Sequence, residues 1–546
     1  MRARQLTARA RRLVPPGVLG LGLGKGPPPG WEPLAAGVGV DPAPQSGPVA
    51  PPHSSGGLFS AVGRTRAFPS PRFWSDDRDG LLFLFELHGF EELAVYAAGD
   101  ASPEGEELWT SVLGSWLDEC AEPSLPAWHP YPLSGRVMAW CAALSRGGWP
   151  QPLHDRLAAS LWRQARVLSR SVEHDIGGNH VLRNAAALAI AGACLQAPRL
   201  RAKGVRILRG ELDAQLLPDG GHEERSPSYQ RHIRAELADV RTVLDRAADH
   251  ETTWLGSALD RMDAWLEALA GPDRTLPLLN DAWEGPPLAS SSASPFVDLA
   301  DSGYVIMRHG SDQAVLDVAP VAPAHLPAHA HADVLSFVLW ADGRPLVVDP
   351  GAYEYAGPER DVFRATAAHS TVEVDGMDQC DFWGPFRAAG MPRVRRIRTD
   401  VGESAVVLVA EHDGYRRLAD PAVHRRAFCW LPGDGVVVLD VLVAQRPHRV
   451  RSALQLAPGV VLGPGDRLGP YRLEQLGSLA PLTTEPGRYA AFLGRAVETA
   501  VVRQAGEARP GEPFGWALVR DGVAVRTTQA GAVVERPSRA PVELAF

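Results

Sequence analysis

Apolar residues recur at intervals of three and four positions from about residue 80 to residue 270. This spacing is typical of amphipathic helices that bury one face. The expected helices cover residues 81–98, 106–120, 135–144, 154–169, 179–195, 205–217, 228–248 and 254–269. Short connections that carry Gly, Pro or Asp join them, so antiparallel helical hairpins are predicted, and several in series tend to curl into a solenoid or toroid.

The pattern changes near residue 300 to strand-like runs that are separated by turns. Residues 304–319 and 335–349 each read as strand, Gly-containing turn and strand, the second around Asp342 and Gly343. Further strands are expected within residues 371–376, 404–415, 435–444, 449–457 and 516–528. A run of helices followed by a run of strands indicates two segregated domains, the second a large antiparallel β-sandwich.

The chain is 546 residues long, which fits two large domains better than one. Residues 1–57 are rich in Pro and Gly and are predicted to form a disordered N-terminal segment. The helical domain is assigned to residues 58–295 and the strand domain to residues 296–546. No run of about 18 apolar residues is present, so no membrane span is expected.

The N-terminus resembles an export signal only loosely. Its apolar run is rich in glycine, is interrupted by Pro15 and Pro16, and lacks a clear cleavage site. Five dispersed cysteines without CxxC spacing do not indicate a disulfide framework. Both features favour a cytoplasmic location, while the periplasm or secretion stays open.

The formal net charge of −9 argues against general nucleic-acid binding, which needs a broad basic face. An anionic sugar still fits, because a local basic cleft is enough to bind it. Only Lys25 and Lys203 are lysines among the 55 basic residues, which together with abundant Ala, Gly and Pro is typical of a high-GC genome. The number of arginines therefore indicates little about function.

Two polar residues begin a strongly apolar helix in the segment GGNHVLRNAAALAIAGA. Asn179 and His180 follow two glycines that allow close backbone approach. A helix cap explains Asn179, since Asn is a favoured N-cap residue. It does not explain His180.

A tyrosine is predicted in the first turn of a helix in the segment DGGHEERSPSYQRHIRAEL. Ser226 and Pro227 form a favourable N-cap and first-turn pair, so Tyr229 lies near free N–H groups and the positive end of the helix dipole. This position favours the phenolate that a tyrosine base needs. The alternative is an ordinary helix start with solvated arginines.

Histidines and acidic residues gather in PAHLPAHAHADVLSFVLWADGRPLVVDPGAYEY and the later AAHSTVEVDG. In an extended segment His329, His331 and Asp333 point to one face, while Asp349 ends the returning strand and His369 begins a later one. Imidazole and carboxylate together suit zinc. The alternative is a hydrogen-bond network that links two hairpins.

Taken together, these segments resemble the heparinase II/III-like family of polysaccharide lyases, which also includes alginate lyases. The resemblance covers roughly residues 75–460, and further pieces such as LLFLFELHGFEEL, YPLSGRVMAW and LLNDAWEG occur in the expected order. It implies an incomplete (α/α) toroid followed by an antiparallel β-sandwich, with a catalytic cleft between them. It also implies a carbon–oxygen lyase that cleaves a uronic-acid-containing anionic polysaccharide by β-elimination.

The resemblance assigns roles to four residues of the predicted site. Asn179 and His180 would neutralise the uronate carboxylate, which makes the C5 proton more acidic. Tyr229 would act as general acid, a second role as base stays open, and His329 would be the partner base or acid. Because the proton beside a carboxylate is very weakly acidic, hydrogen-bonding groups must stabilise the charge that develops when it leaves.

The resemblance also implies a structural Zn²⁺ ion held by His331, Asp349 and His369. The residues predicted to bind substrate are Arg225, Arg231, Arg234, Glu223 and Tyr353. The expected partner is an anionic polysaccharide or oligosaccharide, such as heparan, alginate, chondroitin, hyaluronan or an exopolysaccharide. The oligomeric state stays open, and a dimer is one option.

The sequence departs from the family at three positions. Arg183 stands where relatives often carry an acidic residue, Ser370 makes HST from the commoner HNT, and Gln455 stands where histidine is frequent. The weak export signal is a fourth departure, since degradative relatives are usually exported. Specificity and turnover are the properties that these changes affect.

Two other functions fit the same residues. A glycoside hydrolase on this scaffold would use carboxylates such as Glu223 and Glu224 as acid and base, although adjacent residues seldom face the same bond. A non-degradative or inactive family member would bind or process glycans in capsule or exopolysaccharide production. Retention of Tyr229 and His329 argues against the latter.

Overall fold

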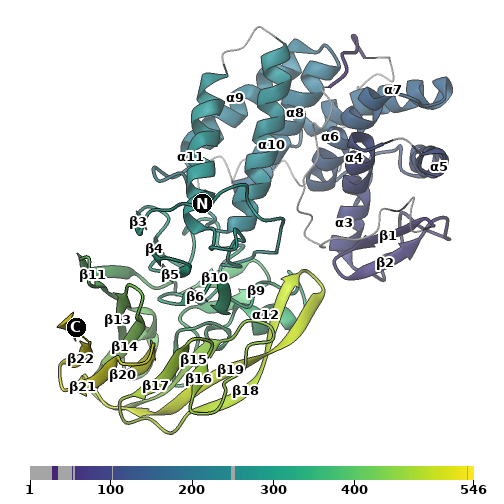
Figure 1. The fold of residues 1–546 in the computed structure, drawn as a ribbon. Helices are drawn as coiled ribbons and strands as arrows, with labels where there is room; N and C mark the ends of the chain where they lie inside the picture. The colour runs from purple at the N-terminus through teal and green to yellow at the C-terminus, as the bar shows by residue number, and fades with distance from the viewer. Residues whose placement is uncertain (1–27, 35–51, 53–55, 101, 248–251, 538) are drawn as a thin grey trace. The chain divides into compact units, whose positions relative to one another are not determined.

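The computed structural model describes residues 28–34, 52, 56–100, 102–247, 252–537 and 539–546 (Figure 1). Most of the predicted disordered segment, residues 1–57, lies outside these residues. The chain divides into two compact units. Unit 1 comprises Met1–Gly220 and Tyr229–Asp263, and unit 2 comprises Gly221–Ser228 and Ala264–Phe546. Among the described residues, no helix has the length and hydrophobicity that crossing a bilayer requires.

Unit 1 is built of helices preceded by one β-hairpin. Its elements are β1 (Leu58–Ala61), β2 (Arg64–Ala67), α3 (Leu81–Gly89), α4 (Glu91–Ala98), α5 (Pro103–Glu119), α6 (Pro130–Arg146), α7 (Gln151–Leu168), α8 (Gly178–Cys194), α9 (Pro198–Gln215), most of α10 (Pro227–Arg246) and the first part of α11 (Thr253–Leu269). Helix α6 packs against α3, α4, α7 and α8, and α8 packs against α9. Prolines in the first turn start several of these helices, since proline has the helical φ and needs no donor there.

The first predicted helix, residues 81–98, is wrong as a single element. The structure divides it into α3 and α4 at Phe90, which has a left-handed φ of 62°. A non-glycine residue in this conformation costs about 1–2 kcal/mol. The Phe90 ring is buried and stacks on Trp74, with edge contacts to Trp116 and Trp140. Burial of the ring offsets the backbone cost, and periodicity alone does not reveal such a break.

Helix α8 lies at the centre of unit 1, and nearly all of its residues are buried. Its alanines allow α9 to approach closely. At Gly204 of α9, a Cβ atom would lie 2.5 Å from the backbone nitrogen of Ala189. Packing against α6, α7 and α9 together covers this helix of almost uniform apolar character.

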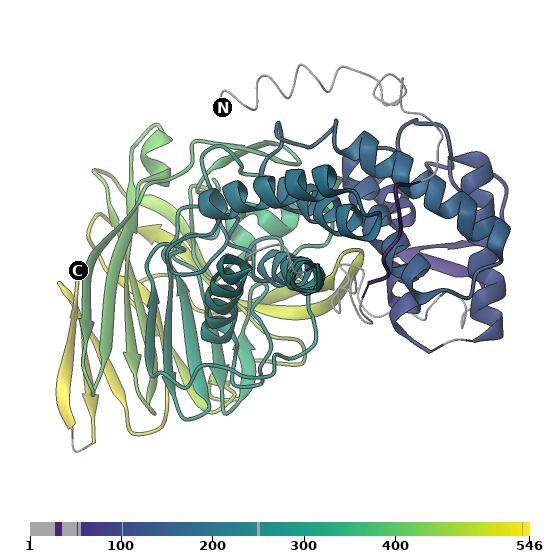
Figure 2. The ribbon, with the colours of Figure 1, turned by 90° about the horizontal axis from the view of Figure 1, so that it is seen from above.

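Unit 2 contains the remaining strands, many of which run side by side in Figures 1 and 2. They are β3 (Phe296–Leu299), β4 (Tyr304–His309), β5 (Asp312–Asp317), β6 (Phe337–Ala341), β7 (Arg344–Val347), β8 (Val372–Val374), β9 (Asp381–Gly384), β10 (Arg387–Ala389), β11 (Val394–Val401), β12 (Val406–His412), β13 (Val423–Leu431), β14 (Gly435–Val443), β15 (His448–Gln455), β16 (Arg467–Leu468), β17 (Tyr471–Leu476), β18 (Thr483–Phe492), β19 (Arg495–Ala508), β20 (Phe514–Val519), β21 (Ala524–Thr528), β22 (Gly531–Arg536) and β23 (Arg539–Ala545). Short helices are α12 (Pro358–Arg364), η1 (Thr366–Ala368) and η2 (Gly414–Arg417).

These strands form a layered antiparallel sandwich. One layer joins the sheet β3-β4-β5-β6-β7 to the sheet β18-β19-β15-β8 through a bridge between Val347 and Leu456. It packs on the seven-stranded sheet β11-β12-β13-β14-β20-β17-β16 around a core that includes Phe337, Phe428 and Trp516. Strands β21–β23 cover the other face of the seven-stranded sheet. Both faces of its central strands β12, β13, β14 and β20 are buried, which explains their continuous apolar runs.

The second part of α11 covers the outer face of the five-stranded sheet. Trp265 and Leu269 of this helix pack with Tyr304, Ile306 and Trp340. Helices followed by an antiparallel sandwich confirm the predicted fold class. The predicted strands at 304–319, 335–349 and 435–444 correspond to β4–β5, β6–β7 and β14.

Candidate functional site

Two histidines of unit 2 share one buried carboxylate. The Nδ1 atom of His329 lies 2.8 Å from Oδ2 of Asp281, and the Nε2 atom of His331 lies 3.0 Å from Oδ1 of the same residue. Asp281 is fully buried. Because an ionised carboxylate only accepts hydrogen bonds, both ring nitrogens donate, which fixes the orientation of both rings.

Arg360 of α12 neutralises this carboxylate. Its guanidinium group donates two hydrogen bonds to the Asp281 carboxylate, and the bond from Nη2 to Oδ2 is 2.9 Å long. The same group also donates to the backbone oxygen of Ala328. Burial alone would raise the pKa of Asp281. The charge of Arg360 and the bonds from the two histidines hold it well below its usual value instead. Asp281 is therefore a permanent anion next to His329.

The segment Gly221–Ser228 brings a second carboxylate to His329. Oε2 of Glu224 lies 3.5 Å from Nε2 of His329, and Glu223 lies 3.4 Å from Nε2 of His325. Burial lowers the pKa of the neighbouring His222. His329 therefore has Asp281 on one ring nitrogen and Glu224 near the other, an arrangement that suits a group exchanging protons.

Backbone contacts hold this segment within unit 2. The Tyr304 hydroxyl donates to the backbone oxygen of Arg225, which has a left-handed φ of 57°. The Ser226 hydroxyl donates to the backbone oxygen of Asp281, and that of Ser228 donates to the backbone oxygen of Trp283. The NDAW portion of the sequence thus fixes both Asp281 and the segment that carries Glu224.

His331, Asp349 and His369 come together as predicted. One ligand atom from each lies within 4.8 Å of the others, and all three residues are buried. Nδ1 of His331 and Nε2 of His369 are buried without a hydrogen-bond partner among the described residues. Unpaired buried nitrogens are costly, so the donor set fits a metal that accepts imidazole and carboxylate, such as zinc.

The residues predicted on α8 lie in unit 1. Helix α8 begins at Gly178, and its N-cap residue is Gly177, so Asn179 is not the cap. Nδ1 of His180 lies 3.2 Å from Oε1 of Glu173, which is completely buried. Glu173 in turn accepts a hydrogen bond from the Asn184 side chain. Glu173 thus orients His180, whose side chain keeps a quarter of its surface exposed.

Tyr229 is buried in the first turn of α10, which begins at Pro227 as predicted. Arg183 of α8 lies 3.2 Å from Nε2 of His232 on α10. His180 lies three positions before Arg183 on α8, and Tyr229 lies three positions before His232 on α10. Residues three positions apart lie on the same face of a helix. The contact therefore places the N-terminal turns of α8 and α10 at the same end of unit 1.

The residues predicted to bind substrate are distributed over both units. Arg225 donates to the backbone oxygen of Ser302, and Arg234 forms a two-pronged ion pair with Asp263 at 2.7 and 2.8 Å. Arg231 is buried in α10 and Glu223 pairs with His325. Tyr353 stacks on Phe363 beneath Arg488. Their role in substrate binding stays a prediction.

Several residues of the site had no clear signal in the sequence. Asp281 stands in LLNDAWEG, to which the family resemblance assigns no role, and Glu173 and Arg360 stand in the short charged runs VEHD and PERD, whose spacing predicts no site. Tyr355 rather than Tyr353 lies next to the candidate catalytic histidine, with its ring 5.9 Å from that of His329. The polar residues that follow buried apolar runs were the available signal, but long sequence separations concealed which ones meet.

The departures from the family pattern have partners in the structure. Arg183 pairs with Glu91 at 2.8 Å and with Glu236 at 3.3 Å, so its charge is balanced. Ser370 and Gln455 meet, because the backbone nitrogen of Gln455 donates to the Ser370 hydroxyl at 3.1 Å. The Gln455 side chain itself donates to the backbone oxygen of Arg488 and to the Thr499 hydroxyl.

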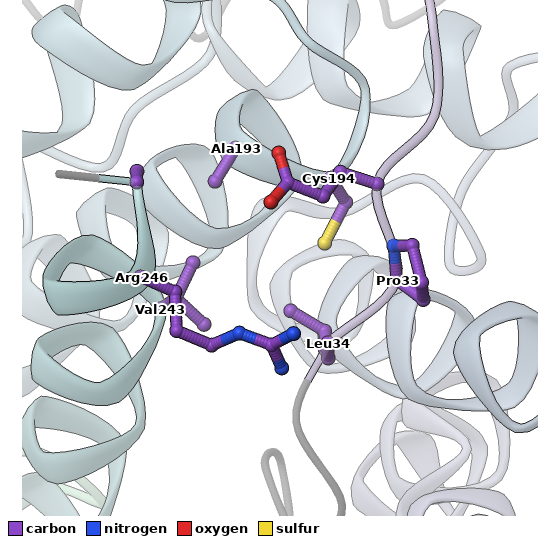
Figure 3. Close-up of a pocket in the computed structure, with 8 residues that line it drawn as sticks. Pro33, Leu34, Ala193, Cys194, Val243 and Arg246 are labelled. Carbon is purple, nitrogen blue, oxygen red and sulfur yellow. The ribbon is translucent and has the colours of Figure 1, made fainter.

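A pocket of unit 1 is lined by none of the predicted site residues (Figure 3). Its lining comprises Glu32, Pro33, Leu34, Ala193, Cys194, Val243, Arg246 and Ala247. These residues belong to the C-terminal ends of α8 and α10 and to a preceding segment. Each helix rises 1.5 Å per residue, so the pocket lies about 20 Å from the first turns that carry His180 and Tyr229.

Comparison with known structures defines the class of fold. A crystal structure of heparinase III matches with a TM-score of 0.72 at 16% sequence identity, covering 88% of this chain and 86% of that one. A heparan sulfate lyase HepC mutant from Pedobacter heparinus matches with a TM-score of 0.63 at 16% identity, covering 98% and 93%. The chain thus has the helical toroid and β-sandwich architecture of these proteins.

Two family models match consecutive parts of the chain. The model described as "Heparinase II/III N-terminus" matches residues 91–293, and "Heparinase II/III-like, C-terminal" matches residues 292–539. Together they span most of the sequence. The chain belongs to the heparinase II/III-like family.

Curated relatives carry two kinds of name. FtsZ-localized protein C of Caulobacter vibrioides (strain NA1000 / CB15N) is 28% identical over 62% of this chain and 61% of that protein. Heparin-sulfate lyases of Bacteroides stercoris and Pedobacter heparinus are 24% and 22% identical, over 52% and 65% of this chain. The matched regions span 61%, 46% and 58% of the three relatives.

Proposed function

We propose that this protein is a polysaccharide lyase that cleaves a uronic-acid-containing anionic polysaccharide, of the glycosaminoglycan type, by β-elimination. The observation that carries the proposal is the His329 ring, held by Asp281 in a fold shared with heparinase III. Two relatives named heparin-sulfate lyase support the substrate class.

The reaction needs a base for the C5 proton and an acid for the leaving oxygen. As the proton leaves C5, its electron pair forms the C4–C5 double bond, the C4–O bond breaks, and the departing oxygen takes up a proton. Tyr229 serves as the general acid for the departing oxygen, and His329 serves as the partner base that takes the C5 proton. A positioned acid or base contributes about 10²–10⁴-fold to such a reaction.

Asn179 and His180 stabilise the negative charge that grows on the uronate carboxylate. A preorganised hydrogen bond to developing charge is worth more than one made only in the ground state. The carboxylate of Glu173 keeps the His180 ring in one orientation, so this donor costs little reorganisation when the charge appears.

His331, Asp349 and His369 are proposed to hold a Zn²⁺ ion. Two histidine nitrogens without partners among the described residues support this assignment. The bound ion would supply a structural cross-link between three segments that are distant in the sequence. His331 donates its other nitrogen to Asp281, as metal-bound histidines commonly do to a carboxylate.

The test is the ultraviolet absorbance of the C4–C5 unsaturated product on heparan sulfate, chondroitin sulfate, hyaluronan and alginate. The native protein is expected to form this product on at least one polymer. Tyr229→Phe removes only the hydroxyl and is expected to lower kcat by at least about 10²-fold. Tyr415→Phe is the matched control, since its buried hydroxyl donates to a backbone oxygen within unit 2.

Two experimental outcomes would contradict the proposed lyase function and favour a different one. Cleavage without the absorbance, with label from water at the anomeric carbon, would indicate hydrolysis by carboxylates such as Glu223 and Glu224. These carboxylates lie near different histidines, His325 and His329, which is not the facing pair that hydrolysis requires. Binding of a polymer without any cleavage would indicate a non-catalytic glycan-binding protein.

A further inference from the structure

The hairpin formed by β9 and β10 of unit 2 presents two large aromatic side chains to solvent. Trp383 is 61% exposed and Phe386 is 47% exposed. The ring of Phe382, which precedes Trp383, packs instead against Arg364, whose guanidinium carbon lies 4.0 Å from the ring centre. Neighbouring exposed aromatic side chains are candidates for contact with a ligand or partner, because each ring offers a large apolar area.

A chain of ring contacts joins this hairpin to the candidate catalytic histidine. The His329 ring lies 5.9 Å from that of Tyr355, and the Tyr355 ring lies 6.3 Å from that of Phe386. Two ring contacts therefore connect Phe386 of the hairpin to His329 within unit 2.

Two buried arginines hold the hairpin turn in place. Arg364 donates to the backbone oxygens of Gly384 and Pro385, at 3.1 and 3.0 Å. Arg360, which pairs with Asp281, also donates to the Pro385 oxygen at 3.3 Å. One guanidinium group thus fixes both the carboxylate behind His329 and the turn of the hairpin, so the aromatic side chains stand on a rigid support.

The charge of the hairpin favours an anionic ligand. Asp381, its acidic residue, pairs with Arg417. Arg387 is exposed, lies 4.5 Å above the Trp383 ring, and has no ion pair among the described residues. An arginine beside an exposed aromatic ring can bind a carboxylate or sulfate while the negative face of the ring attracts the C–H groups of a sugar.

We propose that Trp383, Phe386 and Arg387 form a binding subsite for an anionic polysaccharide, which holds sugar residues beyond the one at His329. Trp383 and Phe386 pack against sugar rings, and Arg387 pairs with a carboxylate or sulfate. Only the position of the subsite, next to a sugar residue at His329, rests on the proposed lyase function. Binding to the subsite requires no cleavage.

Equilibrium binding to full-length protein tests the subsite. Tyr229→Phe serves as the parent, so that the polymer is not degraded, and the ligands are heparan sulfate, chondroitin sulfate, hyaluronan and alginate. For the polymer that the parent binds, Trp383→Ala is expected to raise Kd about tenfold. Arg387→Gln is expected to raise Kd several-fold, and this effect should shrink in 0.5 M salt because ions screen the charge.

Matched variants separate binding from folding. Trp383→Phe keeps an aromatic ring and Arg387→Lys keeps the charge, so both should recover most of the affinity. Val461→Ala and Arg449→Gln alter an exposed apolar residue and an exposed arginine elsewhere in unit 2 and should leave Kd unchanged. In the catalytically competent background, the loss of kcat/KM in Trp383→Ala should increase with substrate chain length.

The outcomes distinguish this subsite from the proposed reaction. Unchanged Kd in Trp383→Ala and Arg387→Gln overturns the subsite even if the native protein is an active lyase. Loss of binding in these variants supports it even if no unsaturated product ever forms. A parent that binds none of the four polymers also overturns it, and the hairpin then belongs to another kind of partner.

Discussion

The carboxylate of Asp281 accepts hydrogen bonds from His329 and His331, and it pairs with Arg360. One side chain therefore orients a candidate catalytic group and a candidate metal ligand. Because Asp281 accepts a hydrogen bond from Nδ1 of His329, Nε2 is the ring nitrogen that can exchange a proton. Asp281 is a positioning residue, since it acts through the histidine.

Replacing Asp281 with Asn tests this role. The amide can donate where the carboxylate only accepts, so His329 is expected to adopt the wrong tautomer. We expect kcat to fall by about 10²–10⁴-fold while KM changes little. Steady-state kinetics on the cleaved polymer measures both constants.

A double variant provides the control for Asp281. If Asp281 acts through His329, then Asp281→Asn combined with His329→Ala should be no slower than His329→Ala alone. Additive losses would contradict the role. Circular dichroism and zinc content of each variant report whether the fold and the metal ligands stay intact.

At the scale of elements, His88 joins α3 to α5 and to the segment before α3. Trp116 of α5 donates to Nδ1 of His88 at 3.2 Å, and Nε2 of the ring lies 3.0 Å from the backbone oxygen of Trp74. Nδ1 can accept from Trp116 and Nε2 can donate to Trp74 only if the ring is neutral and carries its proton on Nε2. Burial lowers the pKa of His88 to about 3.

Acid is therefore expected to loosen this junction. The folded pKa of His88 lies below the usual value of 6.5, so its contribution is fully present above pH 6.5 and is lost as the pH falls towards 3. The loss amounts to at most about 1.4 kcal/mol per pH unit. Urea unfolding between pH 7.5 and 5 measures it.

The control for this prediction is His88→Gln, whose amide can accept from Trp116 and donate to Trp74 but does not titrate. Its stability should depend less steeply on pH than that of the native protein. Equal slopes for the two proteins would assign the acid sensitivity to other groups.

At the scale of the whole molecule, His331, Asp349 and His369 connect three segments of unit 2. Zinc bound there would stabilise the folded state by mass action, by about 4 kcal/mol when free zinc exceeds its Kd a thousandfold. Chelation is therefore expected to lower the Tm of the full chain by roughly 4–7 °C. Differential scanning calorimetry with and without chelator measures this shift.

His331→Ala should reproduce the effect of the chelator. We expect this variant to lose zinc and stability, with a smaller change in polysaccharide Kd. Elemental analysis reports the metal, and full zinc occupancy in His331→Ala would show that the ligand assignment is mistaken. His309→Ala is a matched control, since His309 ends β4 outside the ligand cluster.

Sequence patterns predicted much of what the structure contains. Helical spacing identified α5 to α11 to within a few residues at most ends, and alternating or continuous apolar runs identified β4 to β7 and β14. These features depend on near neighbours in the chain, so periodicity reports them directly. The HAHAD segment likewise marked His329 and His331, because polar residues beside buried strands are costly without a partner.

Only the tertiary structure decided which distant residues meet. Asp281 and Arg360 are 48 and 31 positions from His329. No local pattern encodes such pairs, since they form when separate elements pack. The same holds for Phe90, where burial of one ring overrides the helical pattern of residues 81–98. The sequence by itself determined the elements, the fold class and the chemical groups, whereas packing determined the carboxylate partners that orient them.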